Sequence, residues 1–360
     1  MNLRIMLCHP GASWSTADVW SGLSHGLKAH GVEVVHYRLD ERIADAKRSL
    51  NIRWRTQKRG RPDVPKPTQA DVIYQAGVGE RALRKQVHVV LVVSAMFLHP
   101  DVLVMLKRAG QKVVVLFTES PYDLEGELKI AAVVDGCWTN ERTSVPAFQA
   151  VNPCAGYLPH AWHPEKHTTA VPVDDSVPSH DVVFVGSGFA ERIEWFNAID
   201  WTGIDLGLYG TWKGFGLKTQ VKRCIRGEQI DNAQAAALYR KATIGLNLYR
   251  QYARHADGRR VQVYGESLSP RAYELAACGS FHLSDYRAEV AEVFGARVPT
   301  FRSPSEAGAL IRMWLADPAG RARVAAELPA CVAEASWVQR AATVLGDLHR
   351  LLMPAKAPAA

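Results

Sequence analysis

Short apolar runs rich in valine, isoleucine and leucine recur along this chain, separated by segments with helical spacing. In its first half the predicted strands are LRIMLC (3–8), EVVHY (33–37), DVIYQA (71–76), HVVLVV (88–93), KVVVLF (112–117), GCWTN (136–140) and AGYLP (155–159). Strands that are apolar on both faces and alternate with helices form parallel sheets covered on both sides. The pattern therefore predicts an α/β fold.

The alternation stops at residues 161–180, which are rich in Pro, Thr, Ser and Asp, and then starts again. Further strands are predicted at 181–186, 204–210, 243–249 and 280–285, followed by helices at 303–318, 319–335 and 336–352. We interpret this as an N-terminal Rossmann-like domain (1–160), a linker (161–180), a C-terminal Rossmann-like domain (181–335) and a last helix with a tail (336–360). Because ligands bind beyond the carboxyl ends of such strands, we expect the two domains to face a cleft.

Several classes of protein are disfavoured by composition. No apolar run reaches the roughly 18 residues of a membrane span, and the N-terminus does not resemble a signal peptide. The six cysteines are scattered and form no CxxC pair, which favours a reducing cytoplasm over disulfides or zinc. The expected location is therefore the cytoplasm.

The net charge of +7 comes from one segment, residues 47–66, which holds eight basic residues and one acidic residue. Arg and Lys with an interleaved aromatic, here Trp54, can follow a phosphate backbone and stack on a base. A solvated excursion between strands is the alternative explanation for the same composition.

A short helix is predicted in the stretch ESLSPRAYELAACG, Glu266 to Gly279. Ser269 fits the N-cap, Pro270 the first helical position and Gly279 a left-handed C-cap, so the helix covers about 270–278. Its start offers unpaired N–H groups and a partial positive charge, which suits a diphosphate. Glu274 lies one turn in, where a carboxylate can accept two hydrogen bonds from a ribose diol. The alternative is an ordinary capped helix whose Glu274 points into solvent.

Seven residues separate Glu266 from Glu274, and this stretch resembles the donor site of retaining GT-B glycosyltransferases, in particular the CgeB-like (spore maturation protein-like) branch. The segments DVVFVGSGFAER, YRKATIGLNLYR, YLPHAWHPEKH, LFTESPYDLE, CWTNERTSV and SW at 336–337 are similar to that family in the same order. The resemblance implies a GT-B fold whose last helix crosses back to the N-terminal domain, and a nucleotide-sugar donor, with UDP expected. It implies that Glu274 holds the ribose and that Glu266 lies near the transferred sugar.

The loop after strand 181–186 departs from that family. Members carry an Arg and, five residues later, a Lys that face the diphosphate, whereas this chain has Ser187 and Arg192. Arg250 or Arg271 is a candidate to replace the missing charge, since Arg binds phosphate in a bidentate manner. Backbone N–H groups at Gly186, Ser187 and Gly188 are further candidates. GSGFAE is not a dinucleotide fingerprint, because Glu191 replaces the third glycine.

No D-x-D motif occurs in the chain, so we expect metal-independent transfer, with helix dipoles and arginines in place of a metal. On the acceptor side, His9 and Glu119 each follow a predicted strand and could orient or deprotonate a hydroxyl. A retaining enzyme needs no such base, since the departing phosphate oxygen can take the proton, whereas an inverting one does. His99 and His160 are additional candidates.

Three functions are compatible with these residues. The first is transfer of a sugar from a nucleotide-diphospho-sugar to an acceptor hydroxyl on a protein, a polysaccharide or a small molecule. The second keeps that chemistry and takes hydroxymethylated DNA as the acceptor, with residues 47–66 in contact with the DNA. The third is a GT-B protein that binds without catalysis or acts as a nucleotide-sugar epimerase.

Overall fold

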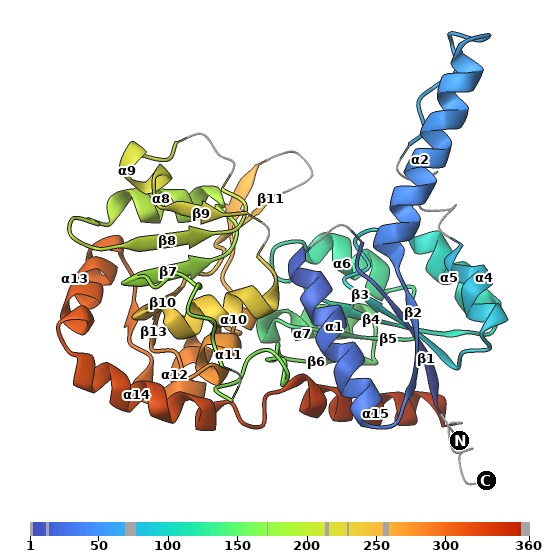
Figure 1. Cartoon of the computed structure of the whole chain (residues 1–360). Helices are drawn as coiled ribbons and strands as arrows, with labels where there is room; N and C mark the ends of the chain where they lie inside the picture. The colour runs from blue at the N-terminus through green and yellow to red at the C-terminus, as the bar shows by residue number, and fades with distance from the viewer. Residues whose placement is uncertain are drawn as a thin grey trace. The chain divides into compact units, whose positions relative to one another are not determined.

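The computed structural model describes residues 3–11, 14–68, 77–170, 172–212, 216–228, 230–254 and 259–353. The predicted strand at 71–76 lies outside these residues. The chain divides into two compact units, Met1–Leu158 with Arg340–Ala360, and Pro159–Gln339. Each unit contains a parallel six-stranded sheet with helices on both faces, as the alternating apolar pattern predicts (Figure 1).

The sheet of unit 1 has the strand order β2-β1-β3-β4-β5-β6. Its strands are β1 (Arg4–Cys8), β2 (Glu33–Tyr37), β3 (Val89–Val93), β4 (Lys112–Phe117), β5 (Gly136–Thr139) and β6 (Ala155–Tyr157). All neighbouring strands run parallel. The predicted strands in the described part of this unit are confirmed, because their Val-rich runs are buried on both faces.

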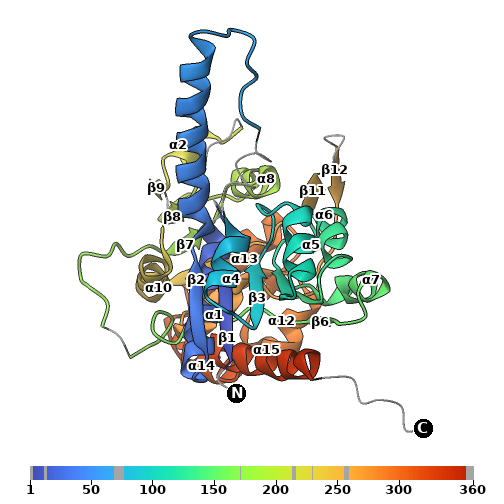
Figure 2. The same cartoon turned by 90° about the vertical axis from the view of Figure 1, so that its right-hand side faces the viewer.

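The helices of unit 1 are α1 (Trp14–Ala29), α2 (Leu39–Lys58), α4 (Val78–Arg84), α5 (Pro100–Arg108), α6 (Leu124–Ala131) and α7 (Val145–Val151). Alternate strand residues such as Met6, Val90 and Val113 form one core with buried residues of α2, α4 and α5. The last helix, α15 (Trp337–Leu352), contributes to this unit from Arg340 onward. Its Asp347 accepts a hydrogen bond of 2.7 Å from Trp138 Nε1 in β5. Figure 2 shows α2 running well beyond the sheet of unit 1.

The sheet of unit 2 has the order β14-β13-β10-β7-β8-β9, and all its pairings are parallel. Its strands are β7 (Val182–Val185), β8 (Leu206–Tyr209), β9 (Ile225–Gly227), β10 (Ile244–Asn247), β13 (His282–Asp285) and β14 (Thr300–Phe301). This is the doubly wound order, in which the chain reverses direction across the sheet between its first and fourth strands, β7 and β10. The four predicted strands are confirmed, whereas β9 and β14, of three and two residues, were not predicted because so short a run has no measurable periodicity.

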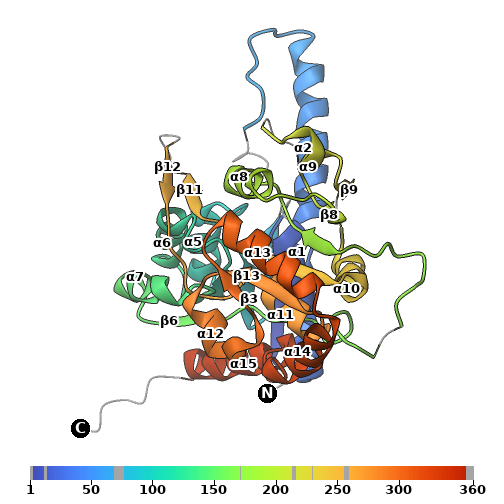
Figure 3. The same cartoon turned by 90° about the vertical axis from the view of Figure 1, so that its left-hand side faces the viewer.

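Helices cover both faces of this sheet. They are α8 (Ala190–Ala198), α9 (Thr219–Lys222), α10 (Asn232–Lys241), α11 (Pro270–Ala277), α12 (Ala288–Phe294), α13 (Pro304–Leu315) and α14 (Pro318–Cys331). Val182 and Phe184 pack in one core with residues of α8 and α13, and Val183 packs in another with residues of α10 and α11. Figure 3 shows these helices around the sheet of unit 2. The hairpin of β11 (Tyr252–Arg254) and β12 (Arg260–Gln262), also not predicted, separates β10 from α11.

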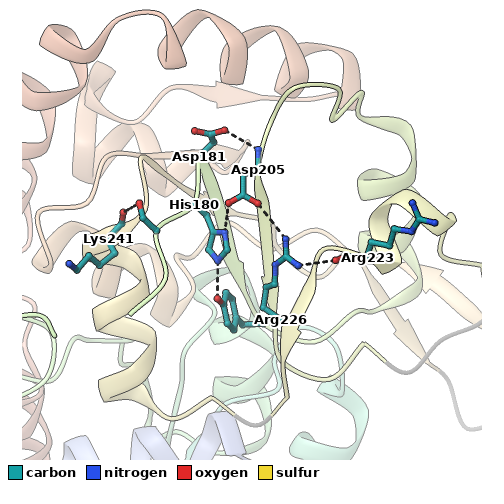
Figure 4. A network of polar contacts seen from close by, with 8 residues as sticks. His180, Asp181, Asp205, Arg223, Arg226 and Lys241 are labelled. Atoms are coloured by element: carbon teal, nitrogen blue, oxygen red, sulfur yellow. Dashed lines mark hydrogen bonds and ion pairs between the residues drawn. The ribbon is translucent and has the colours of Figure 1, made fainter. Parts of the chain in front are cut away.

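A polar network joins the amino ends of β7 and β8 in unit 2 (Figure 4). His180 Nδ1 lies 2.7 Å from Asp205 Oδ2, and its Nε2 lies 2.9 Å from the Tyr209 hydroxyl. Asp181 accepts from the Asp205 N–H at 2.9 Å, and Arg226 lies 3.5 Å from the other oxygen of Asp205. Because ligands bind at the opposite, carboxyl edge of such a sheet, we assign His180, Asp181 and Asp205 to the stability of unit 2.

Residues 161–170 and 172–180, the predicted linker, contain no helix or named strand and belong to unit 2. Trp162 attaches this segment to the last residues of unit 2. It forms a parallel bridge with Ser336, and its Nε1 donates to the Val332 carbonyl at 2.7 Å. Among the described residues, no helix is both long and apolar enough to cross a membrane.

Candidate functional site

Arg271 lies at the carboxyl ends of β7 and β10, the two central strands of unit 2 between which the strand order reverses. Its Nε donates to the Val185 carbonyl at the end of β7 at 2.7 Å, and its Nη1 lies 3.1 Å from Asn247 Oδ1 at the end of β10. The Phe184 ring lies beneath the guanidinium, with 4.5 Å between the ring centroid and Cζ. These contacts fix a positive charge at the carboxyl ends of two adjacent strands, where doubly wound sheets bind their ligands.

Asn247 connects this arginine to the helix that carries it. The amide is fully buried; its Oδ1 accepts from Ser269 Oγ and Arg271 Nη1, and its Nδ2 donates to Ser284 Oγ, each at 3.1 Å. Asn247 was not among the predicted site residues, although a polar residue in the apolar run TIGLNLY was a signal for it. Ser269 occupies the N-cap position as predicted, but its hydroxyl bonds to Asn247 and does not cap the helix.

Helix α11 begins at Pro270 and ends at Ala277, close to its predicted bounds. Gly279 has φ +62, the left-handed conformation expected for its cap. The first turn contains no acidic residue and the N-cap side chain makes no capping bond, so neither of them places a carboxylate at the positive end of the helix dipole.

Glu274 is 7% exposed, so the alternative in which it points into solvent is wrong. Its charge raises the pKa of the buried Tyr239 phenol, in addition to the larger effect of burial, and Arg271 opposes that shift. The carboxylate, the phenol and the guanidinium therefore form one electrostatically coupled group beside the start of α11.

The loop after β7 differs from the prediction in its backbone donors. The Gly186 N–H donates to the Tyr209 carbonyl at 2.8 Å, and the Gly188 N–H donates to the Thr211 carbonyl at 2.9 Å. Two of the three N–H groups predicted to bind a diphosphate therefore already donate hydrogen bonds within unit 2. These bonds attach the loop after β7 to the carboxyl end of β8 and the residues that follow it. Gly210 allows this approach: with φ +114, a Cβ on it would lie 2.6 Å from the Gly186 oxygen.

Arg192, expected to contact the diphosphate, is 8% exposed. Its Nη1 donates to the Ser187 carbonyl at 2.9 Å and its Nη2 to the Leu248 carbonyl at 2.8 Å. The guanidinium therefore ties the loop after β7 to the loop after β10. We interpret Arg192 as a positioning residue that also adds positive potential.

Arg250 and Glu266 lie beyond the carboxyl end of β10, on either side of the β11–β12 hairpin. Arg250 Nε donates to the Tyr252 carbonyl at 3.1 Å, and its guanidinium lies 5.0 Å from the Phe189 ring centroid. The Glu266 side chain is exposed, and its backbone carbonyl accepts from the Glu289 N–H at 3.3 Å.

In unit 1, His9 directly follows β1 and is 6% exposed. Its Nδ1 accepts a hydrogen bond of 3.1 Å from the Gly11 N–H and lies 3.5 Å from Asp40 Oδ1. Burial lowers the pKa of His9, which favours the neutral imidazole. A neutral imidazole has only one nitrogen that can accept a proton. In His9 this nitrogen is Nδ1, which already accepts the hydrogen bond from the Gly11 N–H, and this disfavours His9 as a general base.

Glu119 follows β4 as predicted and is partly buried. Its N–H donates to Glu127 Oε1 at 2.9 Å, and the Ser120 hydroxyl donates to the other oxygen of Glu127.

Two residues with unusual backbone angles follow β3, the strand between β1 and β4 in the sheet. Ser94 and Ala95 have φ of +67 and +57. Consecutive non-glycine residues in the left-handed region are strained and concentrate at functional sites, a feature that sequence patterns do not reveal.

The buried Glu127 predicts a stability that depends on pH. Burial raises the pKa of its carboxyl from 4.5 to about 8. Between these values the unfolded chain loses this proton and the folded chain keeps it, so the free energy of unfolding falls as pH rises through this window. We expect Glu127→Gln to flatten the fall in melting temperature between pH 5 and pH 8.5, whereas Glu41→Gln, at an exposed glutamate, leaves it unchanged. Parallel curves for Glu127→Gln and the wild type would contradict the assignment.

His99 and His160, the additional candidates, have different surroundings. His99 is the N-cap of α5 and its Nδ1 accepts from the Asp101 N–H at 3.3 Å, which is a structural role. His160 is 6% exposed and belongs to unit 2.

The basic segment 47–66 is not a plain excursion, because its first part continues α2 to Lys58. The buried residues of α2 end at Leu50. Beyond that point Trp54 Nε1 donates to the Val64 carbonyl at 2.9 Å, and Lys58 Nζ lies 4.9 Å from the Trp54 ring centroid. Trp54 therefore holds the returning chain against the helix, and the prediction that it stacks on a base is not favoured. We call residues 47–66 the basic arm.

The comparisons with known proteins agree with this architecture. Residues 192–346 match the family model described as glycosyl transferase-like. The matched residues lie mostly in unit 2, which ends at Gln339. No curated protein matches the chain.

Solved structures show that this chain has the GT-B fold. Sucrose-phosphate synthase from Thermosynechococcus elongatus superposes with a TM-score of 0.64 at 13% identity, covering 97% of this chain and 99% of that one. An α-glucosyltransferase in complex with UDP and a 13-mer DNA containing an HMU base gives 0.62 at 11% identity, covering 98% and 99%. HepE from Anabaena in complex with UDP-glucose gives 0.56 at 12% identity, covering 96% and 99%. The predicted fold of two Rossmann-like domains is confirmed.

Proposed function

We propose that this protein transfers a sugar from a nucleotide-diphospho-sugar, with UDP as the nucleotide, to an acceptor hydroxyl. Unit 2 binds the donor and unit 1 contributes to the acceptor side. The observation that carries the proposal is Arg271, held between the ends of β7 and β10 at the start of α11. The diphosphate lies against this guanidinium and the helix start, and Glu274, one turn further on, accepts hydrogen bonds from the ribose diol. UDP or UDP-glucose bound to two proteins of the same fold supports the choice of nucleotide.

The mechanism follows from where charge develops. As the bond between the sugar and the diphosphate breaks, negative charge grows on the leaving oxygen, and Arg271 with the dipole of α11 stabilises it without a metal. We propose retention of configuration, in the manner of E-x7-E enzymes, with Glu266 beside the transferred sugar. The neutral His9, whose Nδ1 accepts from Gly11, supports a mechanism in which the leaving phosphate oxygen takes the acceptor proton. Six free cysteines support action in the reducing cytoplasm.

The test begins with the wild-type chain and a panel of nucleotide-diphospho-sugars. The true donor at 100 times its dissociation constant adds about 2.7 kcal/mol to the free energy of unfolding, which a thermal shift detects. Incubation without acceptor then separates slow nucleotide release, expected for a transferase, from interconversion of free nucleotide sugars, which would indicate an epimerase. Stabilisation by none of the panel would contradict the proposal, and an inverted anomeric product would contradict retention.

DNA is the second candidate acceptor, favoured by the basic arm. Arg48, Arg55 and Arg59 are spaced i, i+7 and i+11, which aligns them on one helix face. Of these, Arg55 and Arg59 are exposed and form no ion pair with any described residue, whereas Arg48 lies 3.7 Å from Asp45. Neutralising phosphates with such a row makes binding strongly dependent on salt.

We expect duplex DNA to bind the wild type with an affinity that falls steeply between 50 and 200 mM salt. The double variant Arg55→Gln/Arg59→Gln should lower the slope of log affinity against log salt by about 1.8, for two lost phosphate contacts. Arg108→Gln/Arg323→Gln removes two exposed arginines elsewhere and serves as the control of equal charge. Equal slopes for the two double variants would exclude the basic arm as a DNA-binding surface.

A further inference from the structure

Unit 2 contains a pocket of about 280 Å³ that is lined by Arg250 but by none of the other donor-site candidates Arg192, Arg271 and Glu274. It lies beyond the carboxyl ends of β10, β13 and β14, and the β11–β12 hairpin contributes Gln262 to its wall. Gly265, which directly precedes Glu266, also lines it. The pocket is therefore a separate site, adjacent in the chain to the glutamate assigned to the transferred sugar.

The inner wall of this pocket is buried and charged. Both oxygens of Asp285 accept from the Tyr249 N–H at 3.1 Å, and the carboxyl is 5% exposed. Arg287, 7% exposed, lies over the Tyr249 ring at 4.0 Å and donates to the Ser267 carbonyl at 3.1 Å. Burial raises the pKa of Asp285 to about 7, against the opposing effect of Arg287.

The outer wall combines exposed aromatic rings with another arginine. Tyr264 is 78% exposed and Tyr286 is 45% exposed, which is unusual for large aromatic side chains. Arg302 Cζ lies 3.5 Å from the Tyr286 ring centroid, and Arg302 forms no ion pair with any described residue. Stacking on the ring holds the guanidinium in place before a ligand arrives, which lowers the entropy cost of binding.

The chemistry of the lining identifies the ligand class. The lining contains three arginines, Arg250, Arg287 and Arg302, and one carboxyl group, that of Asp285. This excess of positive charge favours an anionic ligand. Aromatic rings receive the C–H face of a sugar through dispersion contacts, and the amides of Gln251 and Gln262 can bond its hydroxyls. A volume of about 280 Å³ suits a single small ring with its substituents and not a long chain.

We propose that this pocket is an acceptor subsite that binds a sugar ring carrying an acidic group, a carboxylate or a phosphate. Arg302 and Arg287 bind the acidic group, and Tyr286 supports the ring. This inference rests on the proposed transferase function, because it places the acceptor sugar next to Glu266. The acceptor hydroxyl would then attack the anomeric carbon of the donor, and its proton would pass to the leaving diphosphate.

The test measures binding of glucose 6-phosphate, glucuronate and glucose to the full chain saturated with UDP, by calorimetry or ligand-observed NMR. At least one acidic sugar should bind ten-fold or more tightly than glucose, and comparing the two distinguishes phosphate from carboxylate. Arg302→Gln should remove that preference and leave UDP affinity within two-fold of the wild type. Arg323→Gln, at an exposed arginine of α14, is the matched control. Tyr286→Ala should weaken all three sugars.

Equal affinity for acidic and neutral sugars, or an acidic preference that survives Arg302→Gln, would overturn the inference. The UDP measurement keeps the two proposals apart. If UDP binds and the acidic sugars do not, the acceptor subsite is wrong and the donor assignment stands. If UDP does not bind, the donor assignment fails, and any binding of acidic sugars that depends on Arg302 belongs to another activity.

Discussion

UDP affinity and sugar transfer are expected to fall together, each by about 100-fold, when Glu274 is replaced by glutamine. A carboxylate can accept both hydrogen bonds of a ribose diol, whereas an amide offers one oxygen and one donor group. Hydrogen bonds to charged groups contribute roughly 1.5–3 kcal/mol, and the upper part of that range corresponds to about two powers of ten. Because Glu274 is 7% exposed and glutamine has nearly the same shape, the fold should be retained.

Calorimetry with UDP and steady-state kinetics with the cognate sugar donor measure this effect, and circular dichroism verifies the fold. Glu127→Gln serves as the control, since it also replaces a buried glutamate, 3% exposed, but in unit 1. It should leave UDP affinity unchanged. A folded Glu274→Gln protein that binds UDP as tightly as the wild type would remove Glu274 from the donor site.

A still larger loss of turnover is expected for Arg271→Lys, with kcat falling by about 100- to 1,000-fold, the range found when a donor to a developing oxyanion is removed. Lysine keeps the charge but not the planar fork that donates to the Val185 carbonyl and Asn247 at once. It would also leave those buried acceptors short of a donor, at a cost of about 1–3 kcal/mol in the free energy of unfolding.

Arg192→Lys is the informative comparison for this variant. Both arginines join β7 to β10 at their carboxyl ends. Arg271 contacts the last residues of the two strands, whereas the terminal nitrogens of Arg192 donate to the carbonyls of Ser187 and Leu248 in the loops that follow them. We therefore expect Arg192→Lys to destabilise unit 2 by a similar amount and to lower kcat by less than ten-fold. Both variants are assayed below their melting temperatures, so that each is folded. Equal losses of kcat in the two variants would mean that the two arginines share one role, which would contradict the assignment of the phosphate contact to Arg271.

Most of the fold could be predicted from the sequence, because parallel strands buried on both faces need continuous apolar runs. The strands β2 and β4, for example, have the predicted bounds. The short β9 and β14 and the β11–β12 hairpin escaped prediction. They are defined by pairing with distant strands or across a turn, and their own residues are too few or too polar to show a period.

The candidate site was predicted in part. The start of α11, Glu274 and Arg271 follow from capping signals and residue chemistry that act over one turn of chain. Asn247, which joins that helix to β10, and the engaged N–H groups of Gly186 and Gly188 depend on contacts between segments far apart in the sequence. Trp54 shows the same limit, because its partner Val64 is ten residues away across a turn.

The sequence by itself determined the α/β class, the positions of the long strands and helices, and the chemistry at the start of α11, because hydrophobic period and helix capping are local properties. Only the tertiary structure decided how the three candidate arginines are held. Nothing in the residue type distinguishes Arg192, Arg250 and Arg271, and they differ in the set of groups that their nitrogens contact once β7 and β10 lie side by side. The pocket around Arg302 has the same origin, since the ends of three strands and a hairpin must meet before it exists.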